Sequence, residues 1–131
     1  MTSIVGIGTD ITDVARIKAS YEEYGERFLK RVFTETEIAY CERFGETKFL
    51  HYTARFAAKE AFSKAIGTGM RDGMAFKNVG IRNLPTGQPE IELFGVMAER
   101  WSHHRIHVTL SHTSSVAVAV VVVETHHPPH D

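Results

Sequence analysis

The sequence lacks the features of secreted, membrane-spanning and disulfide-bonded proteins. Cys41 is the only cysteine and cannot form an internal disulfide, which fits a reducing compartment. The longest apolar run, residues 116–123, is too short to cross a bilayer as a helix. Residues 1–10 have neither the basic flank nor the apolar stretch of a signal peptide. We therefore expect a cytoplasmic protein without a membrane partner.

The sequence also lacks a surplus of charge of either sign. Its 15 basic and 16 acidic side chains give a formal net charge of -1, which argues against a protein that coats nucleic acid. Hydrophobic residues make up 43% of the chain and charged residues 24%, as in globular proteins. A chain of 131 residues suits one compact domain, and we find no internal repeat or linker that would divide it.

The first part of the chain predicts a strand followed by a broken helix. Residues 4–8 are apolar and rich in β-branched side chains, which predicts a buried strand. The polar pair Thr9 and Asp10 ends this segment, so we place Asp10 at a strand end. Apolar residues recur at helical spacing from Val14 onward, with Gly25 as a break between two helices.

Two further helices are indicated in the middle of the chain. Thr34 and Glu37 have the spacing of a capping box, which predicts a helix over residues 35–44. The longest helical pattern covers residues 49–66 and ends at the glycine-rich turn 67–69. The alanines of this helix fall on one narrow stripe, where small side chains let another backbone approach closely. They are Ala54, Ala57, Ala58, Ala61 and Ala65.

The second half of the chain predicts mainly β-structure. Residues 79–84 and 90–94 flank a turn and predict a β-hairpin, and residues 96–102 predict a short helix. Residues 106–110 alternate between apolar and polar side chains, as a half-buried strand does. The wholly apolar run 116–123 is typical of a strand buried on both faces. Together these elements predict a single α+β domain with about five strands.

Basic residues are concentrated around the long helix and the turn after it. Six basic and two acidic side chains give residues 48–77 a net charge of +4. The basic ones are Lys48, Arg55, Lys59, Lys64, Arg71 and Lys77. Cations beside a glycine-rich turn suit a phosphorylated ligand, because ammonium and guanidinium groups pair with phosphate and glycines let it approach the backbone. The alternative is a solvated basic surface.

Two carboxylates occupy positions where a ligand site is often built. Asp10 follows a strand, and Glu60 lies in the long helix, about 120° around it from the alanine stripe. If the two converge, they suit Mg²⁺, which takes one or two carboxylates and completes its shell with water and phosphate. The alternatives are that Asp10 caps the following helix and that Glu60 pairs with Lys64 on the surface.

The eight histidines need separate interpretations. His112 lies in the connection between the last two strands, exposed enough to meet a ligand or a hydroxyl group. His103 and His104 end a helix, where a cation is favourable, and His107 faces solvent or a subunit. Three more lie in the tail 125–131, which could bind zinc in principle but has the prolines and the terminal position of a disordered end.

Several motifs occur in the order in which one enzyme family has them. They are Ile7-Gly8-Thr9-Asp10-Ile11, Arg55-Phe56-Ala57-Ala58-Lys59-Glu60-Ala61, Lys64-Ala65-Ile66-Gly67-Thr68-Gly69, Gly87-Gln88-Pro89 and His107-Val108-Thr109-Leu110-Ser111-His112. On these motifs the chain resembles the holo-acyl-carrier-protein synthases, the small bacterial type of 4'-phosphopantetheinyl transferase, from Ile4 to Glu124. The resemblance implies an antiparallel sheet packed against a long helix, in a transferase domain over residues 1–124.

For the activity, the resemblance implies a phosphopantetheine transfer. A serine hydroxyl of an apo acyl carrier protein attacks the β-phosphate of coenzyme A, which gives holo carrier protein and adenosine 3',5'-bisphosphate in support of fatty acid biosynthesis. The implied catalytic residues are Asp10 and Glu60, which would hold Mg²⁺, and Lys64, which would contact phosphate. The coenzyme A site would be lined by Arg55, Ser63, Lys64, Gly67, Thr68, Pro89 and His112.

The acceptor of the serine proton has two candidates, a carboxylate and a metal-bound water. Glu60 would take the proton directly or through water while it also binds the metal, and we favour the water route as a hypothesis. Some members of the family lack the histidine that matches His112, so His112 is the weaker candidate for catalysis.

The resemblance also implies partners. Family members are homotrimers with active sites between subunits, and valines of the run 116–123 would meet about the trimer axis. The acidic carrier protein would dock on basic and apolar residues of the first helices, which here are Arg16, Lys18, Arg27, Phe28 and Arg31. Glu22, Glu23 and Glu26 would repel an acidic partner, so they have to point away from it or the docking differs.

Two other functions compete with the transferase. One is a module that binds coenzyme A or a nucleotide without turnover, and the joint presence of Asp10, Glu60 and Lys64 argues against it. The other is a histidine-dependent metal-binding protein, which the tail suggests. Removal of the residues after Glu124 separates the transferase from the metal-binding protein, because a transferase would lose nothing and a metal-storage protein would lose its capacity.

Overall fold

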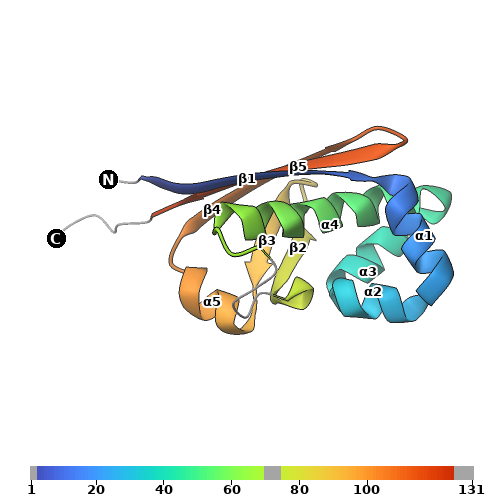
Figure 1. Cartoon of the computed structure of the whole chain (residues 1–131), viewed down its shortest axis with the longest axis horizontal. Coiled ribbons are helices and arrows are strands. Elements are labelled where there is room, and N and C mark those ends of the chain that lie inside the picture. Colours follow the sequence, from blue (N-terminus) through green and yellow to red (C-terminus); the bar gives the residue numbers. More distant parts are fainter. Residues whose placement is uncertain (1–2, 70–74, 126–131) are drawn as a thin grey trace.

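A computed structural model of the chain describes residues 3–69 and 75–125 (Figure 1). The N-terminal half holds β1 (Ile4–Asp13), α1 (Val14–Tyr24), α2 (Glu26–Val32), α3 (Glu35–Glu42) and α4 (Lys48–Ala65). The C-terminal half holds β2 (Val79–Asn83), β3 (Pro89–Leu93), α5 (Gly95–Trp101), β4 (Arg105–His112) and β5 (Val116–Glu124). Short 3-10 helices lie at Gly45–Thr47 and Phe76–Asn78. The α+β class predicted from the sequence is confirmed.

The strands form two antiparallel sheets. One sheet has the order β1-β5-β4, and the other is the predicted hairpin of β2 and β3. The long helix α4 lies along the three-stranded sheet, with α1, α2 and α3 at one end and with the hairpin and α5 below it in the view of Figure 1. The antiparallel pairing and the packing on a long helix are confirmed. The division into two sheets depends on pairing between distant segments, which no local pattern indicates.

Two glycines of β1 let this strand lie directly against α4. A Cβ atom added at Gly6 would come within 1.8 Å of the Ala65 carbonyl oxygen, and one at Gly8 within 2.0 Å of the Ala61 carbonyl oxygen. Gly6 and Gly8 lie on the same face of the strand because they are two residues apart. The close approach predicted from the alanine stripe is therefore confirmed, and the approaching backbone belongs to β1.

The predicted breaks and caps of the first helices are confirmed. Gly25 separates α1 from α2 with a φ of 63°, a conformation that favours glycine. At the start of α3, the Glu37 backbone N–H donates to Thr34 Oγ1 at 3.2 Å, and the Thr34 backbone N–H donates to Glu37 Oε1 at 2.8 Å. These two hydrogen bonds form the capping box.

β1 is longer than the apolar segment predicted. It continues through Asp10 to Asp13, because the polar residues pair with β5 as well, and Asp10 is opposite Ala119. The prediction that Asp10 lies at a strand end is wrong, since it lies inside the strand. The alternative that Asp10 caps the following helix is also wrong, because Asp13 is the residue before α1.

Lys59 is wholly buried and does not belong to a basic surface. Its Nζ atom lies 2.7 Å from Glu37 Oε1, and neither side chain is exposed. The same Nζ donates to the carbonyl oxygens of Phe76 at 3.0 Å and Val79 at 2.6 Å. The interpretation of Lys59 as one cation of a phosphate site is therefore wrong, because its ammonium group is committed inside the fold.

The outer face of the three-stranded sheet is uncovered in the single chain, mainly apolar along β1 and β5 and polar along β4. On β5, every second residue from Ala117 to Val123 is buried, and the valines between them are partly exposed on the opposite face. Ile7 is opposite Val122 and Ile11 is opposite Val118. Ile7 and Ile11 are 62% and 67% exposed. The apolar run on β5 is thus covered by this chain on one face only.

Two further results concern the membrane and the tail. Within residues 3–69 and 75–125, no helix is both long enough and apolar enough to span a bilayer. The histidines of the tail and Arg71 lie outside the described residues.

Candidate active site

The carboxylate of Asp10 lies between β1 and α4 and is held at both oxygens. Lys64 Nζ on α4 lies 3.0 Å from Asp10 Oδ1 and also donates to the Thr9 carbonyl oxygen at 3.1 Å. Thr12 Oγ1 donates to Asp10 Oδ2 at 2.6 Å. Thr12 reaches this oxygen because it is two residues along the strand, on the same face as Asp10. The side chain of Asp10 is only 13% exposed.

Glu60 is the second carboxylate of this site, one helical turn before Lys64 on α4. Partial burial and the negative charge of Asp10 raise the pKa of Glu60 above its usual value, against smaller opposite effects of Arg16 and Lys64. Because Lys64 contacts Asp10 at 3.0 Å and lies one turn from Glu60, the packing of β1 on α4 places Asp10 on the side of the helix that carries Lys64 and Glu60. The alternative of a Glu60–Lys64 surface pair is wrong, because the ammonium group contacts Asp10 instead.

The donor atoms of Asp10 and Glu60 fit a magnesium ion. Both side chains offer carboxylate oxygens, the ligands that Mg²⁺ prefers, and the ion commonly uses only one or two of them. Burial first, and the charge of Asp10 second, raise the pKa of Glu60, and a bound cation would stabilise its ionised form. In the part of the chain that the structure describes, no three His, Cys, Asp or Glu side chains gather, so a larger protein-only metal cage is not formed there.

The end of α4 forms the predicted glycine-rich turn. Gly67 and Gly69 have φ values of 82° and 60°, and the backbone N–H groups of Thr68 and Gly69 both donate to the Ser63 carbonyl oxygen. The hydroxyl group of Ser63 is buried and donates to the Glu60 carbonyl oxygen at 2.7 Å. Ser63 thus holds the turn through its backbone, while Gly67 leaves open space beside the chain.

A second group of predicted residues lies in a separate small cavity of about 220 Å³. Arg55, Pro89 and His112 line it, together with Tyr40, His51 and Asn83. Asp10, Glu60 and Lys64 are not among its lining residues. Within one chain, Arg55, Pro89 and His112 therefore line a cavity to which the two carboxylates and Lys64 do not contribute.

Arg55 is fixed inside this cavity. Its guanidinium group donates to the His51 carbonyl oxygen at 3.1 Å and to Asn83 Oδ1 at 2.6 Å, and it lies 4.4 Å from the centre of the Tyr40 ring. The His51 ring lies 5.6 Å from the His112 ring. Burial, with Arg55 and His112, lowers the pKa of His51 to about 4, so this ring is neutral near pH 7. A fixed guanidinium beside two imidazoles suits an anionic ligand group.

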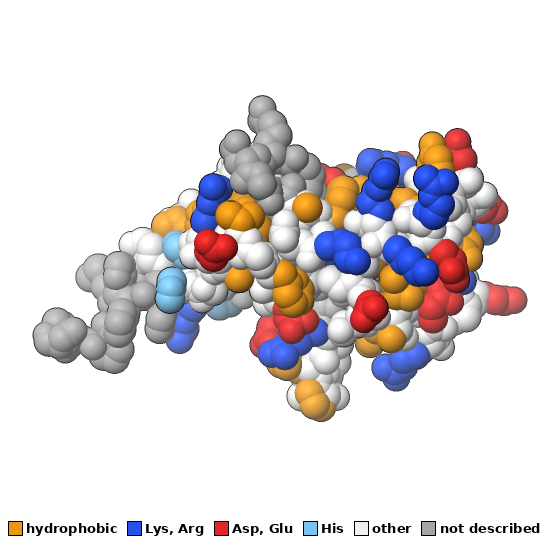
Figure 2. All heavy atoms as spheres, turned by 90° about the horizontal axis from the view of Figure 1, so that it is seen from below, with side chains coloured by type: hydrophobic (Ala, Val, Ile, Leu, Met, Phe, Trp, Pro, Cys, Tyr) orange, Lys and Arg blue, Asp and Glu red, His pale blue; other side chains and the backbone are white. Residues whose placement is uncertain are grey.

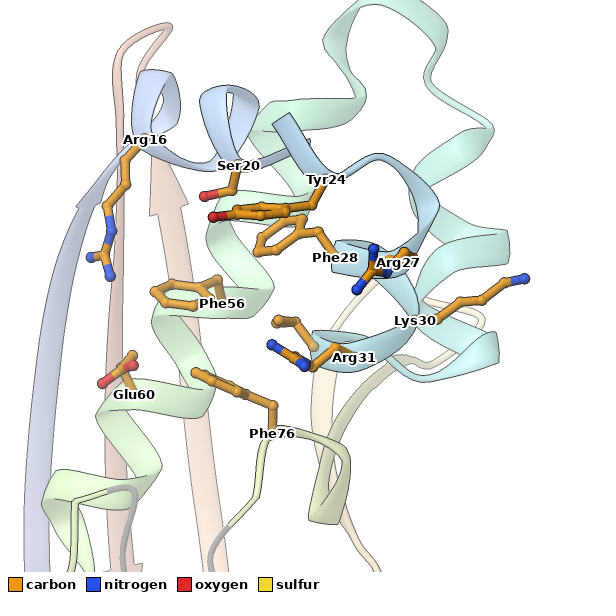
Figure 3. Close-up of a pocket in the computed structure, with 11 residues that line it drawn as sticks. Arg16, Ser20, Tyr24, Arg27, Phe28, Lys30, Arg31, Phe56, Glu60 and Phe76 are labelled. Carbon is orange, nitrogen blue, oxygen red and sulfur yellow. The ribbon is translucent and has the colours of Figure 1, made fainter. Parts of the chain in front are cut away.

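A groove of about 740 Å³ begins at Glu60 and runs between α1, α2 and α4. Figure 3 shows the side chain of Arg16 pointing from α1 toward Glu60. Phe56 and Phe76 form part of the groove wall. The basic residues that line the groove are Arg16, Arg27, Lys30 and Arg31. Figure 2 shows Lys and Arg side chains gathered over the end of the molecule formed by α1 and α2, with hydrophobic side chains between them.

Most of the residues expected to meet the carrier protein line this groove, whereas the acidic residues of the same helices do not. Of the residues predicted to meet an acidic carrier, Arg16, Arg27, Phe28 and Arg31 line it, and Lys18 does not. None of the three acidic residues on these helices, Glu22, Glu23 and Glu26, is among the lining residues. The walls of the groove on α1 and α2 therefore carry basic side chains and none of these three acids.

Sequence reasoning missed several residues that the structure places at these sites. His51 precedes Arg55 by one helical turn, and this spacing could have drawn attention to it. Phe56 and Phe76 stack at 5.3 Å in the groove, although they come from segments far apart in the sequence. Thr12 contacts Asp10 from a position that no motif marks.

Comparison with known proteins identifies the family. A model of the 4'-phosphopantetheinyl transferase superfamily matches residues 6–121. The holo-[acyl-carrier-protein] synthase of Solibacter usitatus is 46% identical over 124 residues, which cover 92% of this chain and 98% of that protein. The holo-[acyl-carrier-protein] synthase of a Jannaschia species is 46% identical over 128 residues, which cover 92% of this chain and 85% of that protein.

Solved structures of the same enzymes share the fold. The Bacillus anthracis synthase in complex with CoA (3',5'-ADP) has a TM-score of 0.80 and 34% identity, over 94% of this chain and 98% of that one. The Neisseria meningitidis synthase has a TM-score of 0.83 and 34% identity, over 92% of this chain and 98% of that one. This chain belongs to the 4'-phosphopantetheinyl transferase superfamily and, within it, to the holo-[acyl-carrier-protein] synthases.

Proposed function

We propose that this chain transfers the 4'-phosphopantetheine group of coenzyme A to a serine of an apo acyl carrier protein. The serine oxygen forms a bond to the β-phosphorus of coenzyme A, and the bond from that phosphorus to the bridging oxygen breaks. Adenosine 3',5'-bisphosphate leaves, and the carrier protein becomes the holo form used in fatty acid biosynthesis. Residues 1–124 form the transferase domain, which acts in the cytoplasm.

One observation carries the proposal: Asp10 contacts Lys64, one helical turn from Glu60 on α4, and Glu60 lines a basic groove. Asp10 and Glu60 would hold Mg²⁺, which when bound neutralises the charge of a pyrophosphate and of the leaving phosphate. Lys64 is 52% exposed, so its flexible side chain can reach a phosphate oxygen while its stem stays on α4. Two carboxylates and a cation beside a groove match what phosphoryl transfer needs.

Glu60 is the candidate for the serine proton. Its raised pKa makes the carboxylate a better proton acceptor than an ordinary surface glutamate. The proton would pass from the serine hydroxyl through one water molecule to a Glu60 carboxylate oxygen. Arg16, which lowers the pKa of Glu60, would keep the carboxylate ionised before the transfer.

The carrier protein would dock in the groove that leads to Glu60. Arg16, Arg27, Lys30 and Arg31 supply positive charge for an acidic partner, and Phe28, Phe56 and Phe76 supply apolar contact area. Because Glu60 lines the groove, a serine at the surface of the docked carrier would be held next to this carboxylate.

The active enzyme would be a homotrimer with sites between subunits. The outer face of the β1-β5-β4 sheet, with its exposed isoleucines on β1 and valines on β5, would be covered by the other two copies. The separation of the two groups of predicted residues supports this arrangement. Asp10, Glu60 and Lys64 of one subunit would bind the pyrophosphate, and the cavity of Arg55, Pro89 and His112 on a neighbour would bind another anionic part of coenzyme A.

Mass spectrometry of the carrier protein tests the proposal. The enzyme is incubated with apo acyl carrier protein, coenzyme A and Mg²⁺, and the carrier should gain one phosphopantetheine group. A parallel reaction with chelator should leave the carrier unmodified. No mass gain, while a known synthase modifies the same carrier in a parallel tube, would refute the proposed function.

A further inference from the structure

We propose that Thr12 is a positioning residue for the metal site, with a hydroxyl group that fixes the Asp10 carboxylate in its metal-binding orientation. The inference rests on the proposed function, because it takes Asp10 as a magnesium ligand. Thr12 lies outside the motifs that carry the family resemblance, so only its contact with Asp10 draws attention to it.

The contact itself is short and has a fixed direction. Thr12 Oγ1 lies 2.6 Å from Asp10 Oδ2, a distance typical of a hydroxyl that donates to an ionised carboxylate. An ionised carboxylate can only accept, so the proton belongs to Thr12. Charge-assisted hydrogen bonds of this kind are about twice as strong as neutral ones.

The surroundings of Thr12 hold its hydroxyl in place. Thr12 is 3% exposed and lies opposite Ala117, which is wholly buried on β5. A β-branched side chain has few accessible rotamers in a strand, so the hydroxyl cannot easily turn away. The backbone on either side is fixed by pairing with β5 from Gly6 to Asp13. Thr12 is therefore a rigid donor on the same strand as the carboxylate it contacts.

The two oxygens of Asp10 consequently have different partners. Oδ2 accepts from buried Thr12, and Oδ1 lies near the half-exposed ammonium of Lys64. A carboxylate with one oxygen held by a rigid donor presents its other oxygen in one direction. In metal sites, hydrogen bonds of this kind orient the ligands, and their loss typically costs roughly 10–100-fold in metal affinity.

Binding of Mn²⁺, used as a paramagnetic probe for Mg²⁺, tests the inference without any turnover. The titration of free Mn²⁺ is followed by electron paramagnetic resonance for the wild-type chain, Thr12→Val, Thr12→Ser and Asp10→Asn. Thr12→Val keeps the shape of the side chain and removes the donor, so its Mn²⁺ affinity should fall by about 10-fold or more. Thr12→Ser keeps the hydroxyl and should bind Mn²⁺ within about 3-fold of the wild type, on the same reasoning.

The variants separate failure of the inference from failure of the proposed function. If Asp10→Asn loses Mn²⁺ affinity and Thr12→Val keeps it, Thr12 does not position the carboxylate and the inference is wrong. If the wild-type chain binds no Mn²⁺, or Asp10→Asn binds it equally well, the metal site and the inference both fail. Thermal unfolding of all four proteins is the control for folding. Equal losses of affinity in Thr12→Val and Thr12→Ser would also overturn the inference, because the hydroxyl would then not be the cause.

Discussion

The carboxylate of Glu37 and the ammonium group of Lys59 lie 2.7 Å apart, and neither side chain is exposed to solvent. Glu37 Oε2 also accepts the backbone N–H of Ile81 at 2.8 Å, and Lys59 donates to the Phe76 carbonyl oxygen at 3.0 Å. Burial lowers the pKa of Lys59, whereas Glu37 opposes this effect. The pair joins α3 and α4 to the segment that carries Phe76 into the groove wall.

Replacing Lys59 by methionine should lower the free energy of unfolding by about 3–5 kcal/mol, because the Glu37 carboxylate would stay buried without its cation. Urea denaturation measures this change. Lys48→Met is the matched control, since Lys48 pairs with the exposed Glu42 at 3.3 Å and its loss should cost about 1 kcal/mol or less. Equal stability of Lys59→Met and the wild type would show that the buried pair is not needed for folding.

Replacing Gly8 by alanine should destabilise the protein by at least about 1–3 kcal/mol, the usual cost of overpacking. The added Cβ would lie 2.0 Å from the Ala61 carbonyl oxygen, and a backbone atom of the α4 helix cannot move aside cheaply. Gly80→Ala is the control, because its Cβ would meet only side chains, at 3.2 Å or more. Thermal unfolding compares the two variants. A Gly8→Ala protein that melts no lower than Gly80→Ala would contradict the close packing of β1 on α4.

Glu60→Gln should abolish the transfer and yet stabilise the metal-free protein near neutral pH. The folded-state pKa of Glu60 is raised, so the folded chain binds more protons than the unfolded chain between the ordinary value of 4.5 and the raised value. The free energy of unfolding therefore falls as pH rises through this window, and a glutamine avoids that loss.

Thermal unfolding in the presence of a chelator measures the Glu60 effect. The advantage of Glu60→Gln over the wild type should be present above the raised pKa and vanish well below 4.5, where Glu60 is protonated in both states. An advantage that does not depend on pH would exclude the carboxylate charge as its cause. Transfer at a normal rate would remove Glu60 from both its metal-binding and its proton-accepting role.

Arg16→Glu should raise the KM for the carrier protein far more than the KM for coenzyme A. Arg16 lines the groove and lies over the Phe56 ring at 5.1 Å, so a reversed charge would face the acidic carrier. Lys18→Glu is the matched control, because Lys18 is on the same helix and does not line the groove. Steady-state kinetics with each substrate varied in turn gives both constants. Equal effects of the two reversals would remove the groove as the docking surface.

Val120→Lys should convert the proposed trimer into monomers and reduce the transfer rate. Val120 is partly exposed on the outer face of the sheet, opposite Thr9 of β1 and Thr109 of β4. A charged side chain buried in a subunit interface without a partner costs several kcal/mol of desolvation. Analytical ultracentrifugation measures the assembly. A wild-type chain that sediments as a monomer at working concentration would contradict the proposed trimer.

Local features were predictable where a short segment contains all of the interacting groups. The capping box of Thr34 and Glu37, the break at Gly25 and the turn after α4 were each predicted and each found. These elements depend on backbone conformation and on contacts between near neighbours, which the order of residues specifies directly. The length of β1 was not predictable in this way, because its polar end is held by β5, with Thr9 bound to a carbonyl group 110 residues away.

The sequence by itself determined the family, the α+β class and the two carboxylates to examine, since these depend on motif order and on local periodicity. Only the tertiary structure decided how the charges are paired. It placed Lys64 against Asp10 rather than Glu60, buried Lys59 against Glu37, and separated the Arg55 cavity from the carboxylates. The partner of a charged side chain depends on which groups the fold places near it, and these need not be neighbours in the sequence. For Lys64 and Asp10, the packing of β1 on α4 through Gly6 and Gly8, a contact between segments some fifty residues apart, brings the two groups together.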